Sequence, residues 1–167
     1  MEQHTTIKTD LNGTIRNRGF IRAQDSAVAA TEGFTMPRRS TKLSAGYDLF
    51  NNTGEAIVLK AGTTSDKIST GVIAVMRSDE YLAVFVRSGH GFKFSARLAN
   101  STGIIDADYM KEIFLKIRNP YDTDIVIPAG EAIAQGIFMN YLTTDDDSET
   151  VGGDRTGGLG STNATKG

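Results

Sequence analysis

The 167-residue chain contains no cysteine, and its only histidines are His4 and His90. The lack of cysteine excludes disulfide bonds, a thiol nucleophile and cysteine-ligated zinc. A histidine-based catalytic triad has only these two possible centres, and neither histidine has a partner at a spacing typical of metal ligands. We therefore expect His4 to be exposed to solvent and His90 to occupy a turn.

The chain also lacks a strong charge imbalance and a long apolar run. Its 18 Lys and Arg residues stand against 20 Asp and Glu residues, a formal net charge of -2. No global field would attract nucleic acid or a membrane surface. The amino terminus has no apolar signal region, and no run approaches the roughly 20 residues that span a bilayer. We expect a cytoplasmic protein with neither nucleic-acid nor membrane partners, in which binding of a polyanion needs a local cationic site.

The length fits one domain, and a composition of 39% hydrophobic residues with only 3 Pro is that of a folded chain. From Leu43 onward, short β-rich runs alternate with turn residues, as in all-β sandwiches and barrels. No amphipathic helix of normal length is expected between Leu43 and Leu142. The expected strands cover residues 47–50, 56–59, 67–76, 81–86, 103–105, 112–118, 124–127 and 132–139.

The sequence divides into three parts. Residues 1–35 are polar and irregular, with at most a weak helix over 23–31, and we interpret them as an amino-terminal arm. Residues 36–142 form the β domain. Residues 143–167 begin with an acidic linker and continue as a glycine-rich arm that cannot hold a structure by itself. This carboxyl-terminal arm is expected to be flexible and to order on a ligand or a neighbouring subunit.

One predicted strand is apolar on both faces. Residues 81–86 read Tyr-Leu-Ala-Val-Phe-Val, and a small two-layer domain in water would not bury both faces by itself. Either the strand contacts another subunit, which we favour, or it lies in the core of a closed sandwich.

Two polar clusters contain side chains suited to catalysis or to phosphate binding. Asp106 and Asp108 follow a short apolar strand at spacing i and i+2, which places both carboxylates on one side of an extended chain, where one could orient a water molecule. Residues 87–89, Arg-Ser-Gly, offer a guanidinium, a hydroxyl and backbone N–H groups at a bend, as a phosphate cradle requires. The alternative interpretations are an ordinary turn and a surface turn with a salt-bridged arginine.

A glycine-rich segment near the carboxyl terminus resembles a phosphate loop only superficially. Residues 157–162 read Gly-Gly-Leu-Gly-Ser-Thr, but no lysine precedes Ser161 and no helix is expected to follow. By itself the segment indicates a flexible tail.

Taken in order, five segments resemble the motifs of the trimeric deoxyuridine triphosphatase (dUTPase) family, over roughly residues 36 to 163. Any one motif is weak evidence, whereas five in register are specific. The segments are residues 44–49 (SAGYDL), 87–89 (RSG), Asn100 with 103–109 (GIIDADY), 130–135 (GEAIAQ) and 157–162 (GGLGST).

The resemblance implies a jelly-roll-like β fold, a β-clip sandwich or barrel, assembled as a homotrimer. Three active sites would lie at subunit interfaces, each closed by a carboxyl-terminal arm. The implied reaction is hydrolysis of dUTP to dUMP and pyrophosphate with Mg²⁺, by attack of water on the α-phosphorus. Such an activity limits uracil in DNA and supplies dUMP for dTMP synthesis.

The resemblance also assigns roles to single residues. Asp106 would be the general base, and Tyr109 would lie against the deoxyribose and leave no room for a 2′-hydroxyl. Asp48 would lie in the outer shell of Mg²⁺, which the phosphates and water would chiefly hold. The other implied substrate-binding residues are Asn100, Gly103 and Ile104 at the uracil edge, Arg87, Ser88, Gly89 and Gln135 around the phosphates, and Arg155, Leu159, Gly160, Ser161 and Thr162 in the arm.

The chain departs from the family pattern at four places. Ala132 stands where an arginine is common, and Leu159 stands where an aromatic residue usually covers the uracil, so that it can seal but not stack. Arg155 is shifted by one residue, since Asp154 occupies the usual arginine position. After Tyr109 the chain reads Met-Lys-Glu where the family often has x-Gly-Glu.

Two other functions stay open at this level. A dCTP deaminase has a related fold, but Lys116 stands where its catalytic glutamate is expected. A nucleotide-switched regulatory binding protein is the second alternative, since some phage members of the family are regulatory. In that case the amino-terminal segment would dock a protein partner.

Overall fold

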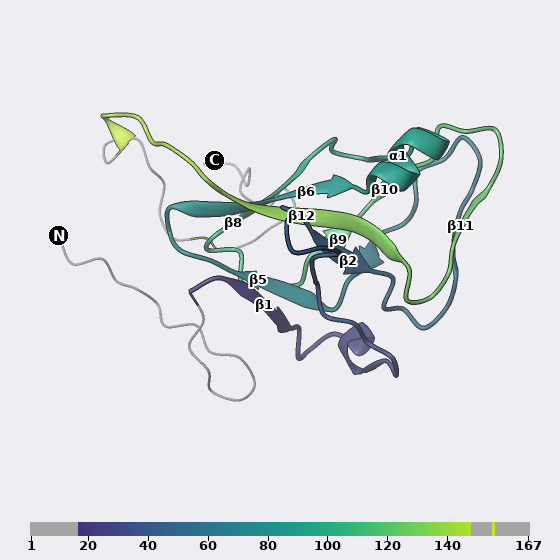
Figure 1. Ribbon diagram of the computed structural model, residues 1–167, viewed down its shortest axis with the longest axis horizontal. Coiled ribbons are helices and arrows are strands. Elements are labelled where there is room, and N and C mark those ends of the chain that lie inside the picture. The colour runs from purple at the N-terminus through teal and green to yellow at the C-terminus, as the bar shows by residue number, and fades with distance from the viewer. Residues whose placement is uncertain (1–16, 148–154, 156–167) are drawn as a thin grey trace, which may run out of the picture.

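The computed structural model describes residues 17–147 and residue 155, and nearly all regular structure within them is β-strand (Figure 1). The all-β class predicted from the sequence is confirmed. The strands are β1 (Gly19–Arg22), β2 (Tyr47–Phe50), β3 (Ile57–Leu59), β4 (Ile68–Ser69), β5 (Val72–Val75), β6 (Glu80–Val86), β7 (Arg97–Leu98), β8 (Gly103–Asp106), β9 (Phe114–Leu115), β10 (Ile117–Arg118), β11 (Ile125–Ile127) and β12 (Ala132–Asn140). Two short helices accompany them, the 3-10 helix η1 (Ala27–Ala30) and α1 (Ser88–Phe94). None of the helices in this described part is long and apolar enough to cross a membrane.

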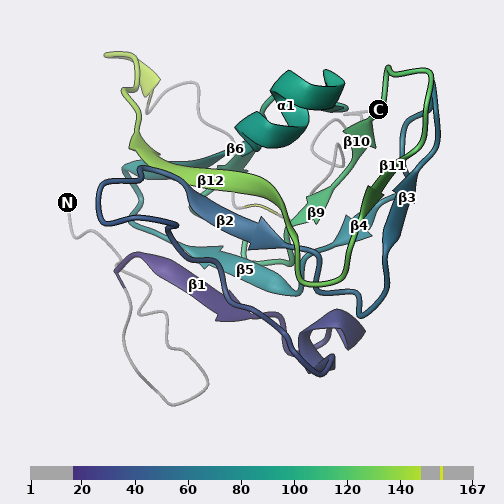
Figure 2. The same cartoon turned by 45° about the vertical axis from the view of Figure 1, so that its right-hand side comes forward.

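A four-stranded antiparallel sheet in the order β2-β12-β6-β8 organises the molecule. Figure 2 shows β2, β12 and β6 side by side, and β8 is labelled in Figure 1. Its register places Asp48 of β2 opposite Gln135 of β12, and Gln135 opposite Phe85 of β6. On the other side of β6, Tyr81 lies opposite Asp106 of β8. The sheet therefore fixes where the segments that resemble the first four motifs lie relative to one another.

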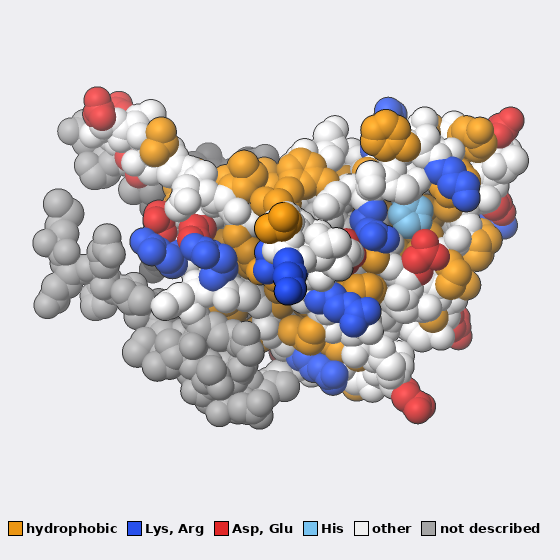
Figure 3. Space-filling view, viewed as in Figure 1, with side chains coloured by type: hydrophobic (Ala, Val, Ile, Leu, Met, Phe, Trp, Pro, Cys, Tyr) orange, Lys and Arg blue, Asp and Glu red, His pale blue; other side chains and the backbone are white. Residues whose placement is uncertain are grey.

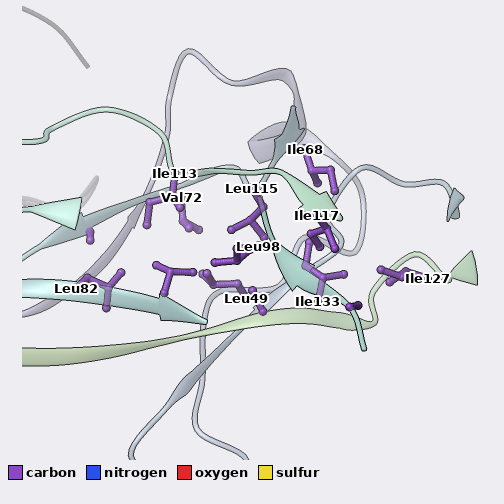
Figure 4. Packing of buried hydrophobic residues seen from close by; sticks show 14 of the residues in the cluster. Leu49, Ile68, Val72, Leu82, Leu98, Ile113, Leu115, Ile117, Ile127 and Ile133 are labelled. Carbon is purple, nitrogen blue, oxygen red and sulfur yellow. The ribbon is translucent and has the colours of Figure 1, made fainter. Parts of the chain in front are cut away.

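The core lies between this sheet and four two-stranded pairs, β1-β5, β3-β11, β4-β9 and β7-β10. Alternate residues of the strands point inward, as the period of two predicts. Figure 4 shows the branched aliphatic side chains of this core packed together, among them Leu49, Val72, Leu82, Leu98, Ile113, Leu115, Ile117 and Ile133.

The amino-terminal segment contributes to this core. β1 pairs with β5 along its whole length, and Phe20 is buried against the rings of Tyr47 and Phe138, with centroids 5.6 and 5.3 Å away. Arg18 forms an ion pair with the buried Glu80, which lowers the pKa of that carboxyl. The expectation of an irregular segment is therefore wrong for residues 19–22, because an apolar pair too short to signal a strand pairs with Ile73 and Ala74, more than 50 residues later.

Other local expectations also need correction. The expected strand over residues 67–76 is split into β4 and β5, because Gly71 has a φ of +71° and turns the chain. The run over 112–118 likewise splits into β9 and β10. His90 lies in α1 and is buried rather than in a turn. A short helix of seven residues is too brief for apolar periodicity to reveal.

Candidate active site

The first group of candidate residues surrounds Asp48, which is buried on β2. Arg87 Nε lies 3.0 Å from Asp48 Oδ1, and Ser40 Oγ donates a hydrogen bond of 2.7 Å to Asp48 Oδ2. Arg87 immediately follows β6, two strands away from β2, so the sheet register brings the guanidinium and the carboxylate together. The Arg-Ser-Gly segment therefore contains a salt-bridged arginine, as one of the two sequence interpretations expected.

Gln135 joins this group from β12. Its Nε2 donates to the backbone carbonyl of Val86 at 3.3 Å, beside Arg87. The side chain lies directly over Gly46, where any Cβ would overlap Gln135 Oε1. A side chain at position 46 would therefore displace the Gln135 amide from this place.

Ser88 and Gly89 are exposed in the first turn of α1, so the predicted bend is the start of a helix. The next residue, His90, is buried, and its Nε2 lies 3.6 Å from Glu131 Oε1. Burial lowers the pKa of His90, and the positive charge of Arg87 acts in the same direction, whereas Glu131 opposes them. The helix therefore packs a neutral imidazole next to the residues expected to hold phosphate.

An open cavity of about 520 Å³ adjoins the Asp48–Arg87 pair. Arg38, Arg39, Phe50 and Ala132 line it together with that pair and Ser40. Figure 3 shows Lys and Arg side chains gathered over the middle of the face along which β12 runs in Figure 1. Sequence reasoning did not select Arg38, Arg39 or Ser40, although a pair of arginines just before the first motif was a usable signal.

The second group of candidate residues surrounds Asp106, whose side chain is half exposed at the end of β8. Arg155 pairs with Asp106 through one nitrogen and with Asp108 through Nε, the latter at 2.6 Å. These contacts with the two carboxylates raise the pKa of Arg155. The contacts are exposed to solvent, so they contribute little stability and exchange readily with another partner.

Tyr109 is buried next to this pair of carboxylates. Its hydroxyl donates to the backbone carbonyl of Glu112 at 3.0 Å, and the Arg155 guanidinium lies 5.9 Å from its ring centroid. Burial raises the pKa of Tyr109, so the phenol stays protonated and neutral. Burial and the hydrogen bond to Glu112 hold the ring in place beside the two carboxylates.

Asn100 is exposed in the turn between β7 and β8, where Ser101 has a φ of +64°. Gly103 and Ile104 then begin β8, which is the edge strand of the four-stranded sheet. Within the described residues, one edge of β8 therefore offers backbone N–H and C=O groups that the sheet does not pair. Such groups suit recognition of a flat base by hydrogen bonds.

The two groups lie at opposite ends of β6. Asp106 is paired with Tyr81, whereas Arg87 follows Val86, and six residues of strand at about 3.3 Å each separate them by about 20 Å. A single chain therefore does not bring the predicted base and the predicted phosphate-binding residues into one site.

The described residues contain no cluster of three or more Asp, Glu or His side chains that could hold a metal ion. Asp48 has one side-chain partner on each oxygen, an ion pair with Arg87 at Oδ1 and a hydrogen bond from Ser40 at Oδ2, and a carboxylate has about four acceptor positions. It therefore retains capacity for metal-bound water, which fits a cation held mainly by phosphates and water. Leu159, Gly160, Ser161 and Thr162 lie outside the described residues.

The comparisons with known proteins agree with one another. The family model of dUTPase matches residues 32–162. The deoxyuridine 5′-triphosphate nucleotidohydrolase of Lactococcus lactis subsp. lactis is 38% identical over 138 residues, which are 79% of this chain and 90% of that protein. The crystal structure of dUTPase from Streptococcus mutans has 36% identity and a TM-score of 0.66, and covers 77% of this chain and 99% of that one.

A mutant dUTPase from phage phi11 of S. aureus, whose structure describes a structural Mg(II) ion, has a TM-score of 0.63 and covers 78% of this chain and 94% of that one. Its identity of 21% makes this a likeness of fold alone. The family model, the bacterial relative and the bacterial structure all point to one assignment: the chain belongs to the dUTPase family.

Proposed function

We propose that this chain hydrolyses dUTP to dUMP and pyrophosphate, at sites that form between three copies of the chain. Membership of the dUTPase family supports the reaction. The observation that carries the shared site is the separation of Asp106 from Arg87 by about the length of β6. An assembly in which β8 of one subunit faces the Asp48–Arg87 group of a neighbour would place both groups around one nucleotide.

In the chemical step, Asp106 accepts a proton from the attacking water. The water oxygen forms a bond to the α-phosphorus, the bond from that phosphorus to the α–β bridging oxygen breaks, and pyrophosphate leaves with the bonding electrons. Ser88 donates a hydrogen bond near the bridging oxygen, where negative charge develops. Arg87, Gly89 and Gln135 hold the phosphates.

Selection of the nucleotide would rest on the second group. The buried ring of Tyr109 is held in place by its hydrogen bond to Glu112, so it would sterically exclude a sugar that carries a 2′-hydroxyl. The edge of β8 at Gly103 and Ile104, with Asn100, would pair with the uracil edge. A cytosine presents a donor where uracil presents an acceptor, so the same groups reject it.

Mg²⁺ would be held by the substrate phosphates and water, with Asp48 in its outer shell. When bound, it supplies charge neutralisation on the phosphates. Arg155 pairs with Asp106 and Asp108, and we expect the triphosphate to draw this guanidinium away, which frees Asp106 to act as base. Leu159, Gly160, Ser161 and Thr162 would then close over the nucleotide.

The test is pyrophosphate release from dUTP, dCTP, dTTP and UTP at equal concentrations, with the Asp106→Asn variant alongside. We expect activity on dUTP alone and a loss of about 10²–10⁴-fold in the variant, as for a positioned general base. Asp66→Asn is a matched control, because Asp66 is an exposed carboxylate outside both groups.

Hydrolysis of dTTP at a comparable rate, or an Asp106→Asn variant as active as the parent, would contradict this proposal. Ammonia release from dCTP would favour the deaminase alternative instead. The cytoplasmic location and a regulatory protein partner stay predictions from the sequence.

A further inference from the structure

The open cavity beside β2 carries more positive charge than its own wall balances. Arg38, Arg39 and Arg87 line it, and Asp48 is the one carboxylate among the described residues of the lining. That carboxylate pairs with Arg87 and also accepts a hydrogen bond from Ser40. Two arginines in the wall therefore have no carboxylate from the wall to neutralise them.

Arg39 is tied to its own loop. Its guanidinium donates to the backbone carbonyls of Lys42 and Ser44, at 3.0 and 3.3 Å. These bonds hold the chain as it enters β2. Binding a ligand with the same nitrogen would require breaking them.

Arg38 is placed differently. Its backbone carbonyl accepts a hydrogen bond of 2.8 Å from the Asp48 N–H, which fixes its main chain beside β2. Its guanidinium carbon lies 5.4 Å from the ring centroid of Phe50, a buried residue of the same cavity wall. Within residues 17–147 and 155, the Arg38 side chain forms no ion pair or side-chain hydrogen bond. A guanidinium over an aromatic face keeps its N–H groups available in its plane.

The strand across from Phe50 adds no charge here. Ala132 of β12 pairs with Phe50 and also lines the cavity, where it contributes a methyl group. Arg38 is therefore the cation that covers this part of the wall, and Arg87 lies on the other side of Asp48. An anion with several negative groups would contact the guanidinium of Arg38 on one side and that of Arg87 on the other.

We propose that Arg38 is a phosphate-binding residue that holds the two terminal phosphates of the nucleotide, the ones that leave as pyrophosphate. This rests on the proposed hydrolysis of dUTP, because Ser88 and Gly89 follow Arg87 directly and would hold the α-phosphate end of the same triphosphate. The planar fork of arginine matches two phosphate oxygens at once. The charge that develops in the chemical step is greatest at the bridging oxygen, which Ser88 contacts, so Arg38 on the outer oxygens of the leaving phosphates contributes mainly to binding.

The test uses the full chain with Arg38→Gln and Arg38→Lys. Calorimetry measures binding of inorganic triphosphate and of deoxyuridine, and steady-state kinetics measure kcat and KM for dUTP. We expect Arg38→Gln to weaken triphosphate binding and raise KM by about tenfold, with kcat within about threefold and deoxyuridine binding unchanged. For Arg38→Lys we expect a triphosphate affinity and a KM between those of the parent and of Arg38→Gln, because lysine keeps the charge but lacks the planar fork.

Lys60→Gln is the charge-matched control, because Lys60 lies outside the cavity in a surface pair with Asp124. It should bind triphosphate like the parent. Unchanged triphosphate binding in both Arg38 variants, or an equal loss in Lys60→Gln, would overturn the proposal. A parent that does not cleave dUTP, together with an Arg38→Gln variant that binds triphosphate more weakly, would refute the proposed reaction while leaving Arg38 as a polyphosphate-binding residue. Thermal unfolding of each variant identifies any that fails to fold. If Arg38→Gln fails to fold, triphosphate binding by Arg38→Lys decides whether the proposal stands.

Discussion

At the scale of single residues, Gly46 links backbone packing to the candidate phosphate site. The side chain of Gln135 lies over its Cα, and Gln135 also donates to Val86 next to Arg87. Gly46 of the first motif therefore helps to position Gln135 of the fourth motif beside Arg87 of the second, because glycine leaves the space that the Gln135 side chain occupies.

We predict that Gly46→Ala displaces Gln135. The added methyl would overlap Oε1 and lie 3.3 Å from Cβ of Gln135, so the glutamine must leave the Val86 carbonyl. We expect KM for dUTP to rise by about tenfold and the free energy of unfolding to fall by about 1–3 kcal/mol, measured by steady-state kinetics and urea titration.

Gly91→Ala provides the control for this change. A Cβ at Gly91 in α1 would lie 3.6 Å from Val86, an ordinary contact, and alanine favours a helix by up to about 1 kcal/mol. Equal changes in KM and in the free energy of unfolding for Gly46→Ala and Gly91→Ala would show that the position of Gln135 does not depend on glycine at position 46.

At the scale of secondary-structure elements, α1 couples the candidate phosphate residues to a buried imidazole. Ser88 and Gly89 form its first turn, and His90 Nε2 lies 3.6 Å from Oε1 of Glu131, the residue just before β12. Burial lowers the pKa of His90 below its ordinary value of 6.5. The unfolded chain therefore binds a proton more readily than the folded chain does.

We predict that protonation of His90 destabilises the protein as pH falls. Above about pH 7 the imidazole is neutral in both states and contributes no pH dependence, whereas below about 6.5 the unfolded state gains the proton first. His90→Gln should therefore lose less stability than the parent between pH 7.5 and 5, measured by thermal unfolding at each pH. His4→Gln serves as the control, and parallel curves for parent and His90→Gln would refute this role.

At the scale of the whole molecule, the two groups lie about 20 Å apart along β6, so the proposed site needs more than one chain. The edge strand β8 and the strongly apolar β6 lie in one sheet with β12. Asp106 lies near the start of β6, and Arg87 follows its last residue. We expect a homotrimer by light scattering, with three times the mass of one chain.

We predict that two inactive variants restore one another. When Asp106→Asn and Arg87→Gln are unfolded together and refolded as a mixture, about a quarter of the shared sites combine an intact Asp106 with an intact Arg87 from a neighbour. Pyrophosphate release should then reach about a quarter of the parental rate, whereas each variant refolded alone stays near its own low rate. A mixture no more active than its two components would place the whole site within one chain.

Much of this protein follows from local sequence. Alternation of apolar and polar residues and the turn residues between them determined the all-β class and most of β2, β6, β11 and β12, because strand periodicity depends on neighbouring residues alone. Five motif-like segments in register along the chain likewise sufficed to indicate the family, which the comparisons confirm.

Only the tertiary structure decided which of these pieces meet. Phe20 enters the core through a pairing with Ala74, more than 50 residues away, and Arg38 comes to lie over Phe50 in the cavity that Arg87 also lines. Asp106 is held about 20 Å from Arg87 by the length of the strand between them. Register and packing join residues distant in sequence, and no local pattern records those contacts.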